Sequence, residues 1–242
     1  MKKLFITGCN GKLSQYLISV LCKDYKIIGC DVHKASKSKN IIYYKIDLSK
    51  LKSLEILIDS LITENNFPDI LINNAAIDSV PKENEISNGF DLENFEDIFH
   101  INLRAPIYLI DKISEYWIKK KISGRVINFT SIYSSVSPDP NLYDKRFKKN
   151  ILYGASKSSL VNITKQMAVI LIRDNIFINS ISFGGIYNHQ DDNFVKKYSE
   201  RVPVKRMMTV DEIISSINYL LDEKNTYSVG SNIIVDGGYT II

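Results

Sequence analysis

The apolar residues of the chain fall into two kinds of pattern, which alternate from one end to the other. Short apolar runs bounded by turn-forming residues predict buried strands, and longer stretches with apolar residues every three or four positions predict amphipathic helices. The short runs predict strands at Lys3–Thr7, Lys26–Asp31, Ile41–Ile46, Asp69–Asn73, Gly124–Thr130, Ile176–Ile181 and Asn232–Val235.

The stretches between these runs predict helices. Ser49 is a suitable N-cap for a helix that ends near Glu64, and Thr209 with Glu212 forms a capping box before a helix that ends near Leu221. Helices are also predicted from the loop after the first strand to about Leu21, and over Leu92–His100, Ala105–Lys119 and Tyr153–Arg173.

Strands that alternate with helices favour βαβ units and a parallel sheet. We therefore predict an α/β fold in which one doubly wound, mostly parallel sheet of seven strands carries helices on both faces. The 242 residues suit a single domain over 1–242 better than two small domains. Ligands of such sheets bind outside the carboxyl ends of the strands, where the strand order reverses. The residues that follow the strands are thus the first candidates for chemistry.

A glycine loop joins the first strand to the first helix. Gly8 permits a sharp turn, and Gly11 lets the backbone approach a diphosphate that the helix N-terminus attracts. Ser14 is small enough for the helix to pack on the strand. On this motif alone, a glycine turn without a ligand is an equal alternative. The residues predicted to bind a cofactor here are Gly8, Asn10, Gly11 and Leu13.

Carboxylates follow the second and third strands. Asp31 stands 20 residues after the second glycine of the loop, where it can accept hydrogen bonds from the ribose hydroxyls of an adenosine. Its charge also repels a 2′-phosphate and favours NAD over NADP, although Lys34 and Lys37 could neutralise that phosphate. Asp47, followed by Leu48, could bond the adenine amino group or could simply favour a helix N-terminus.

The fourth strand ends in Asn73-Asn74-Ala75-Ala76. Two small side chains after paired amides leave room for a flat ring or a ribose against the edge of the sheet. Asn74, Ala75 and Ala76 are therefore predicted to contact the cofactor.

Tyr153 and Lys157 stand four positions apart in a predicted helix and so share one of its faces. A nearby ammonium stabilises a phenolate and lowers the pKa of the tyrosine, which suits the tyrosine to proton transfer. Ser131 follows the fifth strand, where its hydroxyl could bond a substrate carbonyl. Taken singly, such a Tyr–Lys pair also occurs on surface helices, and Asn102 could be an ordinary polar helix residue.

Taken in order, these motifs resemble the short-chain dehydrogenase/reductase family, from Lys3 to Gly238. The resemblance implies a Rossmann-like fold and hydride transfer between a nicotinamide and a carbon of the substrate. It implies that Tyr153 is the general acid in reduction and the general base in oxidation. Lys157 then lowers the pKa of Tyr153. Both Tyr153 and Lys157 are also expected to contact the cofactor, Lys157 at the nicotinamide ribose.

The resemblance gives roles to two further residues. Ser131 orients the substrate oxygen, and Asn102 holds a water that links Lys157 to solvent. The segment after the sixth strand normally contacts the nicotinamide, which makes Gly184 and Ile186 candidates for cofactor binding.

The chain departs from the family pattern at two places. Lys12 and Ser14 occupy positions where the common short members carry glycine. The spacing of the two loop glycines is instead similar to the branch that acts on sugar nucleotides. Phe183 replaces the usual proline after the sixth strand, which leaves the geometry of that segment open.

A long insertion, residues 133–152, precedes Tyr153 and is predicted to bulge over the mouth of the active site. Its basic residues Lys145, Arg146, Lys148 and Lys149 could meet an anionic substrate or could belong to a solvated loop. The candidate residues for substrate binding are Ser131, Tyr133, Lys145, Arg146 and His189.

The insertion, the Gly184–Tyr187 stretch and the Asp-Gly-Gly-Tyr ending are similar to a subgroup associated with bacterial surface and flagellar glycan synthesis. This similarity points to a sugar-like or sugar-phosphate substrate.

Composition limits the partners. A net charge of +4 is small for a nucleic-acid binder, which usually shows a clustered basic excess, so no nucleic acid is expected. No apolar run approaches the length of a membrane span, so no membrane is expected either. Cys9, Cys22 and Cys30 show neither metal-ligand nor disulfide spacing, which indicates no metal and a reducing cytoplasm.

The leading hypothesis is an NAD(P)-dependent oxidoreductase that acts on a polar, carbohydrate-derived small molecule. The helices over 105–119 and 153–173 are expected to pack against a second copy in a homodimer or homotetramer. One alternative is a nucleotide-sugar epimerase or dehydratase that uses the same tyrosine. Another is a cofactor-binding regulatory protein with little catalysis, although the complete set of four catalytic groups argues against it.

Overall fold

One sheet organises the protein. A computed structural model describes residues 1–34, 41–78, 89–90, 92–143 and 148–242. The strand order is β3-β2-β1-β4-β5-β6-β7 and every pairing is parallel, where a mostly parallel sheet was predicted. The order reverses between β1 and β4. The strands are β1 (Lys3–Thr7), β2 (Lys26–Asp31), β3 (Ile41–Lys45), β4 (Ile70–Asn73), β5 (Arg125–Ser131), β6 (Phe177–Phe183) and β7 (Asn232–Val235).

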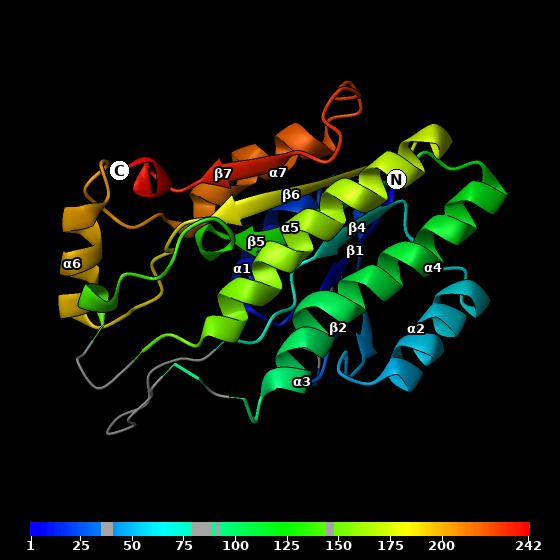
Figure 1. Ribbon diagram of the computed structural model, residues 1–242. Coiled ribbons are helices and arrows are strands. Elements are labelled where there is room, and N and C mark those ends of the chain that lie inside the picture. Colours follow the sequence, from blue (N-terminus) through cyan, green and yellow to red (C-terminus); the bar gives the residue numbers. More distant parts are fainter. Residues whose placement is uncertain (35–40, 79–88, 91, 144–147) are drawn as a thin grey trace.

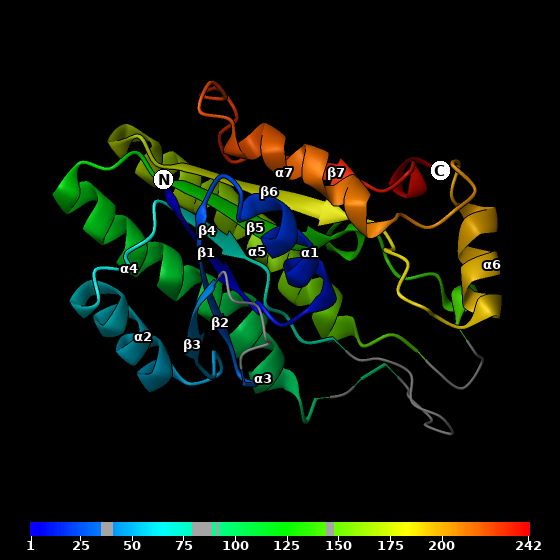
Figure 2. The same cartoon turned by 180° about the vertical axis from the view of Figure 1, so that it is seen from behind.

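Helices cover both faces of the sheet, as predicted. On one face lie α2 (Leu51–Thr63), α4 (Ala105–Lys120) and α5 (Ile151–Leu171) (Figure 1). On the other lie α1 (Lys12–Leu21) and α7 (Ile213–Leu221) (Figure 2). Each layer has its own core, because the strands are apolar on both sides. None of the described helices is both long and apolar enough to cross a membrane.

The chain enters α4 through a π-helical turn. The short helix α3 (Phe95–Phe99) runs directly into this turn at His100–Arg104 and then into α4. The prediction of separate helices at 92–100 and 105–119 was therefore wrong in its boundary. π turns are rare and often occur at functional sites. This one buries Asn102, which is 1% exposed.

The start of α2 differs from the prediction. Lys50, and not Ser49, is the N-cap. The Ser49 N–H and Oγ both donate to Asp47 Oδ1, at 3.0 and 2.7 Å. These bonds, led by the one from the Ser49 hydroxyl, lower the pKa of Asp47. The predicted capping box at Thr209 and Glu212 is confirmed, on a 3₁₀ turn that leads into α7.

A third, smaller core lies beyond the carboxyl ends of the strands. It includes α6 (Asp192–Arg201), which the sequence pattern did not predict, and which lies near the C-terminus (Figure 1). The insertion contributes 3₁₀ turns at Ile132–Ser134 and Pro140–Leu142, and α5 begins at Ile151, two residues before the predicted start. The residues of this core are Ile132, Leu142, Tyr198, Val202, Met207 and Tyr239.

Candidate active site

The ends of β1 and β4 are joined where the strand order reverses. Asn74 Nδ2 donates to the carbonyls of Thr7 and Gly8, at 2.9 and 3.2 Å. The N–H groups of Asn74 and Ala75 both donate to Thr7 Oγ1 at 3.0 Å. The segment that was predicted to contact the cofactor is thereby fixed against the glycine loop.

Gly8 and Gly11 each have a structural reason to be glycine or to lack a large side chain. Gly8 has a φ of +66°, and a Cβ there would lie 2.9 Å from Ala75 Cα. A Cβ on Gly11 would lie 3.3 Å from the Gly8 carbonyl oxygen. Gly11 is the N-cap of α1, which has no side-chain cap bond and no acidic residue in its first turn. The first N–H groups of a helix attract an anion such as a diphosphate. Ser14 is fully buried, as expected for close packing of α1 on the sheet.

The carboxylate of Asp31 is fixed beside this loop. Its Oδ2 accepts from Asn10 N–H at 3.0 Å and its Oδ1 from His33 N–H at 3.1 Å. Asn10 Nδ2 also donates to the Lys34 carbonyl at 3.0 Å. An acid next to an uncapped helix N-terminus fits a dinucleotide, because ribose hydroxyls donate to the acid and phosphates accept from the helix. Leu48, after β3, is buried.

Both departures from the family pattern are accommodated. Lys12 turns away from the loop and donates to Asn188 Oδ1 on the segment after β6. Phe183 is buried, and its ring packs edge-on against Phe129 at a centroid distance of 5.3 Å. Gly184 N–H donates to the Val235 carbonyl at 2.9 Å.

The backbone of the segment after β6 packs closely against neighbouring backbone. A Cβ on Gly184 would lie 2.9 Å from Asp236 Cα, so a side chain there would force the backbones apart. Two residues further, Ile186 forms a parallel bridge with Met208. Both predicted nicotinamide contacts thus lie on backbone that is held by neighbouring strands and loops.

Tyr153 and Lys157 lie one turn apart on α5, as predicted. Lys157 Nζ is 5.8 Å from the centroid of the Tyr153 ring and donates to the Phe129 carbonyl at 2.9 Å. Lys157 is 3% exposed, and this burial lowers its pKa to about 8, against an opposing effect of the Asp78 carboxylate.

The pKa of Tyr153 moves opposite to our prediction. Burial raises it above its ordinary value, the Asp78 carboxylate raises it further, and a hydrogen bond with Ser131 lowers it. The cost of burying a phenolate is the largest of these effects. Ser131 is the last residue of β5, and its Oγ also accepts from Tyr133 N–H at 3.2 Å. The structure thus brings Tyr153, Lys157 and Ser131 together.

Asn102 contacts α5, the helix that carries Tyr153 and Lys157. Its Oδ1 accepts from Ile77 N–H at 2.8 Å, and its Nδ2 donates to the Ile77 carbonyl at 2.9 Å and to Ser156 Oγ at 3.1 Å. Ser156 Oγ in turn donates to the Tyr153 carbonyl at 2.8 Å. The side chain therefore connects the segment after β4 to the first turns of α5. The water that we assign to Asn102 stays a prediction.

An ion pair that the sequence did not reveal lies beside Tyr153. Lys149 Nζ pairs with Asp78 Oδ2, and their side chains are only 12% and 28% exposed. The same Nζ is 5.3 Å from the centroid of the Tyr153 ring. The sequence marks Lys149 only as one of four basic residues of the insertion, and none of the motifs includes Asp78. Its place just after the fourth strand is the signal that could have found it.

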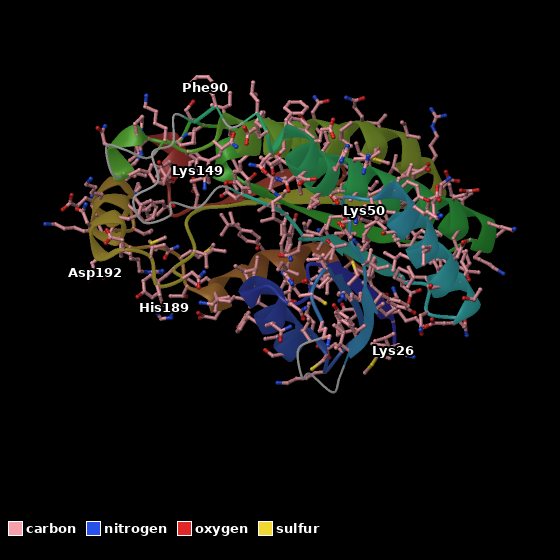
Figure 3. All side chains as sticks on the ribbon, turned by 90° about the horizontal axis from the view of Figure 1, so that it is seen from below. Lys26, Lys50, Phe90, Lys149, His189 and Asp192 are labelled. Atoms are coloured by element: carbon pink, nitrogen blue, oxygen red, sulfur yellow. The ribbon has the colours of Figure 1, made fainter. Side chains whose placement is uncertain are left out.

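A cavity of about 860 Å³ opens beside these groups. Tyr133, a predicted substrate residue, lines it, and its hydroxyl lies 3.0 Å from that of Tyr143. Lys149 on the α5 side and His189 after β6 also line it (Figure 3). Lys145 and Arg146 lie outside the described residues.

Among the described residues, no group of three or more His, Cys, Asp or Glu side chains is placed to hold a metal ion. The three cysteines are free. Burial raises the pKa of Cys9 to about 12, so its thiol stays protonated near neutral pH.

Comparison with known proteins identifies the family. Residues 29–240 match the family model described as "Enoyl-(Acyl carrier protein) reductase". A short-chain dehydrogenase from Leptospira borgpetersenii, solved with bound NAD+, has a TM-score of 0.88 and 28% identity over 99% of this chain and 92% of its own. The chain belongs to the short-chain dehydrogenase/reductase family.

This short-chain dehydrogenase/reductase is an NAD(P)-dependent oxidoreductase of hydroxyl and carbonyl groups. Its curated relatives differ in what they act on. A 3-oxoacyl-[acyl-carrier-protein] reductase of Buchnera aphidicola is 28% identical over 98% of this chain and 96% of its own length. A 7alpha-hydroxysteroid dehydrogenase of Bacteroides fragilis is 28% identical over 99% of this chain and 95% of its own length. Family membership therefore leaves the substrate open.

Proposed function

We propose that the enzyme oxidises or reduces a polar, carbohydrate-derived small molecule. The observation that carries this proposal is the lining of the cavity beside Tyr153, which combines aromatic rings with amides and charged groups. Carbohydrates present apolar ring faces that pack on aromatic rings, and hydroxyls that bond amides and carboxylates. Besides Tyr153 and Phe183, the aromatic lining residues are Tyr133, Tyr143, Phe194 and Tyr198, and the amides are Asn188, Gln190 and Asn193.

Each catalytic residue has a defined task in the proposed reaction. The bound nicotinamide supplies or accepts the hydride. In reduction Tyr153 donates its hydroxyl proton to the substrate oxygen, which Ser131 orients by a hydrogen bond. Lys157, one turn away, stabilises the phenolate that is left. In oxidation Tyr153 takes the proton back.

We also propose where the cofactor lies. The uncapped N-terminus of α1 suits the diphosphate, and Asp31 suits the adenosine ribose. A buried carboxylate at this point favours NAD over NADP, because it repels a 2′-phosphate. Asp47 and Leu48 stay predicted contacts of the adenine, and Asn74, Ala75 and Ala76 of the ring or ribose.

The test is NAD(P)H oxidation over a panel of keto sugars, sugar phosphates and hydroxyketones. We expect turnover of some panel members, and a loss in kcat of roughly 10²- to 10⁴-fold in Tyr153→Phe that far exceeds any change in its Kd for NADH. Tyr227→Phe is the matched control, since Tyr227 is fully exposed. Tight cofactor binding with no turnover anywhere in the panel contradicts the proposal and favours a regulatory protein. A nucleotide sugar retained through purification favours the epimerase or dehydratase alternative.

We further propose that the enzyme is a homodimer or homotetramer through α4 and α5. Val169 and Ile170 on α5 are 72% and 67% exposed, which is unusual for adjacent large apolar residues unless a partner covers them. Val169→Glu should shift the sedimentation coefficient towards the monomer. A wild-type enzyme that sediments as a monomer contradicts this assembly.

A further inference from the structure

The Lys149–Asp78 ion pair shares its cavity with the reacting groups. Asp78 lies in the segment after β4, and Lys149 lies just before α5. Both line the cavity that Tyr153 and Ser131 also line. Since Lys149 Nζ is 5.3 Å from the centroid of the Tyr153 ring, a substrate whose oxygen reaches Tyr153 extends past this pair.

The backbone next to Asp78 is fixed by a side chain that does not line the cavity. Asn102 bonds both backbone polar groups of Ile77, the residue before Asp78, at 2.8 and 2.9 Å. This anchor is 1% exposed and does not involve the Asp78 side chain. A change from carboxylate to amide at Asp78 therefore leaves its backbone in place.

Lys149 is held in a similar way. Ile151 N–H donates to the Gly89 carbonyl at 3.1 Å, and Asn150 Oδ1 caps α5 by accepting from Leu152 N–H at 2.9 Å. Gly89 has a φ of +81°, and a Cβ there would lie 3.1 Å from the Lys149 carbonyl, so the two backbones pack closely. The position of Lys149 is thus set by its neighbours and not by its ammonium.

The pair presents a hydrogen-bond donor and an acceptor side by side. An anionic group of the substrate that approached the Lys149 ammonium would also lie beside the Asp78 carboxylate, and like charges repel. Separating the two partners of a largely buried pair is costly as well. A hydroxyl can instead accept from the ammonium or donate to the carboxylate while the pair stays intact.

We propose that Asp78 and Lys149 bind the hydroxyls of substrate carbons next to the reacting carbon. One hydroxyl donates to the Asp78 carboxylate, and one accepts from the Lys149 ammonium. The substrate class is then a hydroxyketone, or the corresponding polyol in oxidation, that is uncharged at these carbons. This inference rests on the proposed function and names the part of the sugar that the site selects.

The experiment compares erythrulose with butanone, two four-carbon ketones that differ only in their hydroxyls. We measure kcat/KM for both with NADH in the wild type and in Asp78→Asn and Lys149→Gln. The wild type should prefer erythrulose, and each variant should lower kcat/KM for erythrulose roughly 10- to 100-fold, the range for a hydrogen bond to a charged group. The change in charge beside Tyr153 acts on both ketones alike, and butanone makes neither bond, so the preference for erythrulose over butanone should drop roughly tenfold or more in each variant.

Lys148→Gln is the matched control, because Lys148 is adjacent in sequence and exposed, and does not line the cavity. Unchanged thermal unfolding and NADH binding show that a variant is folded. Equal losses on both ketones, or an unchanged preference, overturn the inference while the oxidoreductase proposal stands. A Lys149→Gln variant that spares erythrulose but loses activity on 5-keto-gluconate overturns it in favour of an anion site. A wild type that reduces no hydroxyketone contradicts the proposed function, and the inference with it.

Discussion

Asn102 holds Ile77 by both of its backbone polar groups, with the Asn102 Oδ1 at 2.8 Å from the Ile77 nitrogen and Nδ2 at 2.9 Å from its carbonyl oxygen. The same Nδ2 reaches Ser156 Oγ at 3.1 Å. Three chain segments therefore meet at one buried amide: the π turn before α4, the segment after β4, and α5. Since Asp78 follows Ile77 and Tyr153 precedes Ser156 by one turn, this amide positions residues on two sides of the substrate cavity.

Replacement of Asn102 by alanine should destabilise the protein. It leaves the polar groups of Ile77 and one bond of Ser156 without their partner, which typically costs about 1–3 kcal/mol of unfolding free energy. Urea unfolding measures the loss, and kcat should fall as well because Asp78 and α5 lose their common anchor. Ser156→Ala removes the third of these bonds and the bond from Ser156 to the Tyr153 carbonyl, but leaves both Ile77 groups bonded to Asn102; it is the comparison and should cost less. A wild-type urea midpoint for Asn102→Ala contradicts this account.

Lys157 should make stability depend on pH. Burial lowers its pKa to about 8 from the ordinary 10.5, so between these pH values the folded state binds fewer protons than the unfolded state. The contribution of Lys157 to the unfolding free energy should therefore rise with pH through this window, by up to about 3 kcal/mol. The buried thiols of Cys9 and Cys30, whose pKa values burial raises, act in the opposite direction above their ordinary pKa of 9.0. Tyr153, whose pKa is raised, acts in the opposite direction only above its ordinary pKa of 10.0.

Lys157→Met tests this linkage. The variant should lose most of its activity. The difference in unfolding free energy between wild type and variant should rise with pH between about 8 and 10.5, because the thiols titrate alike in both proteins. Near neutral pH the variant should be at least as stable as the wild type, because it no longer buries an ammonium. Parallel pH profiles for the two proteins show that Lys157 is not the titrating group.

Asp31 should set the choice of cofactor. Its carboxylate is 9% exposed and fixed by the N–H groups of Asn10 and His33. We expect tighter binding of NADH than of NADPH, and a shift of the Kd ratio towards NADPH of roughly tenfold in Asp31→Ser. Titration of nicotinamide fluorescence measures both constants. Asp24→Ser, at an exposed position, should not change the ratio.

The ion pair between Arg201 and Asp139 should tie the insertion to α6. Arg201 Nη1 lies 2.6 Å from Asp139 Oδ2, with side chains that are 34% and 19% exposed. A double-mutant cycle with Arg201→Met and Asp139→Asn should give a coupling of about 1 kcal/mol. The exposed pair Lys112–Glu115, at 3.2 Å, is the comparison and should couple less. Because both segments line or support the cavity wall, KM should rise in each single variant.

The local pattern of apolar and polar residues was enough to predict much of the fold. The bounds of β1, β2 and β7 agree with the prediction, because short apolar runs between turn residues leave little freedom in where a strand ends. α6 was missed for the converse reason. Its residues are mostly polar and only Tyr198 is buried, so no apolar period marks it, although Asp191 caps it through the N–H groups of Asn193 and Phe194.

The sequence by itself determined the relationships that depend on spacing. Four residues in a helix place Tyr153 and Lys157 on one face, and parallel strands bring Ser131 and Asp31 to the same edge of the sheet. Only the tertiary structure decided how far burial raises the pKa of Tyr153 and lowers that of Lys157. It also decided that Lys149 meets Asp78, 71 residues earlier in the chain. Desolvation and ion pairing depend on which distant segments exclude water from a group, and sequence spacing does not specify that.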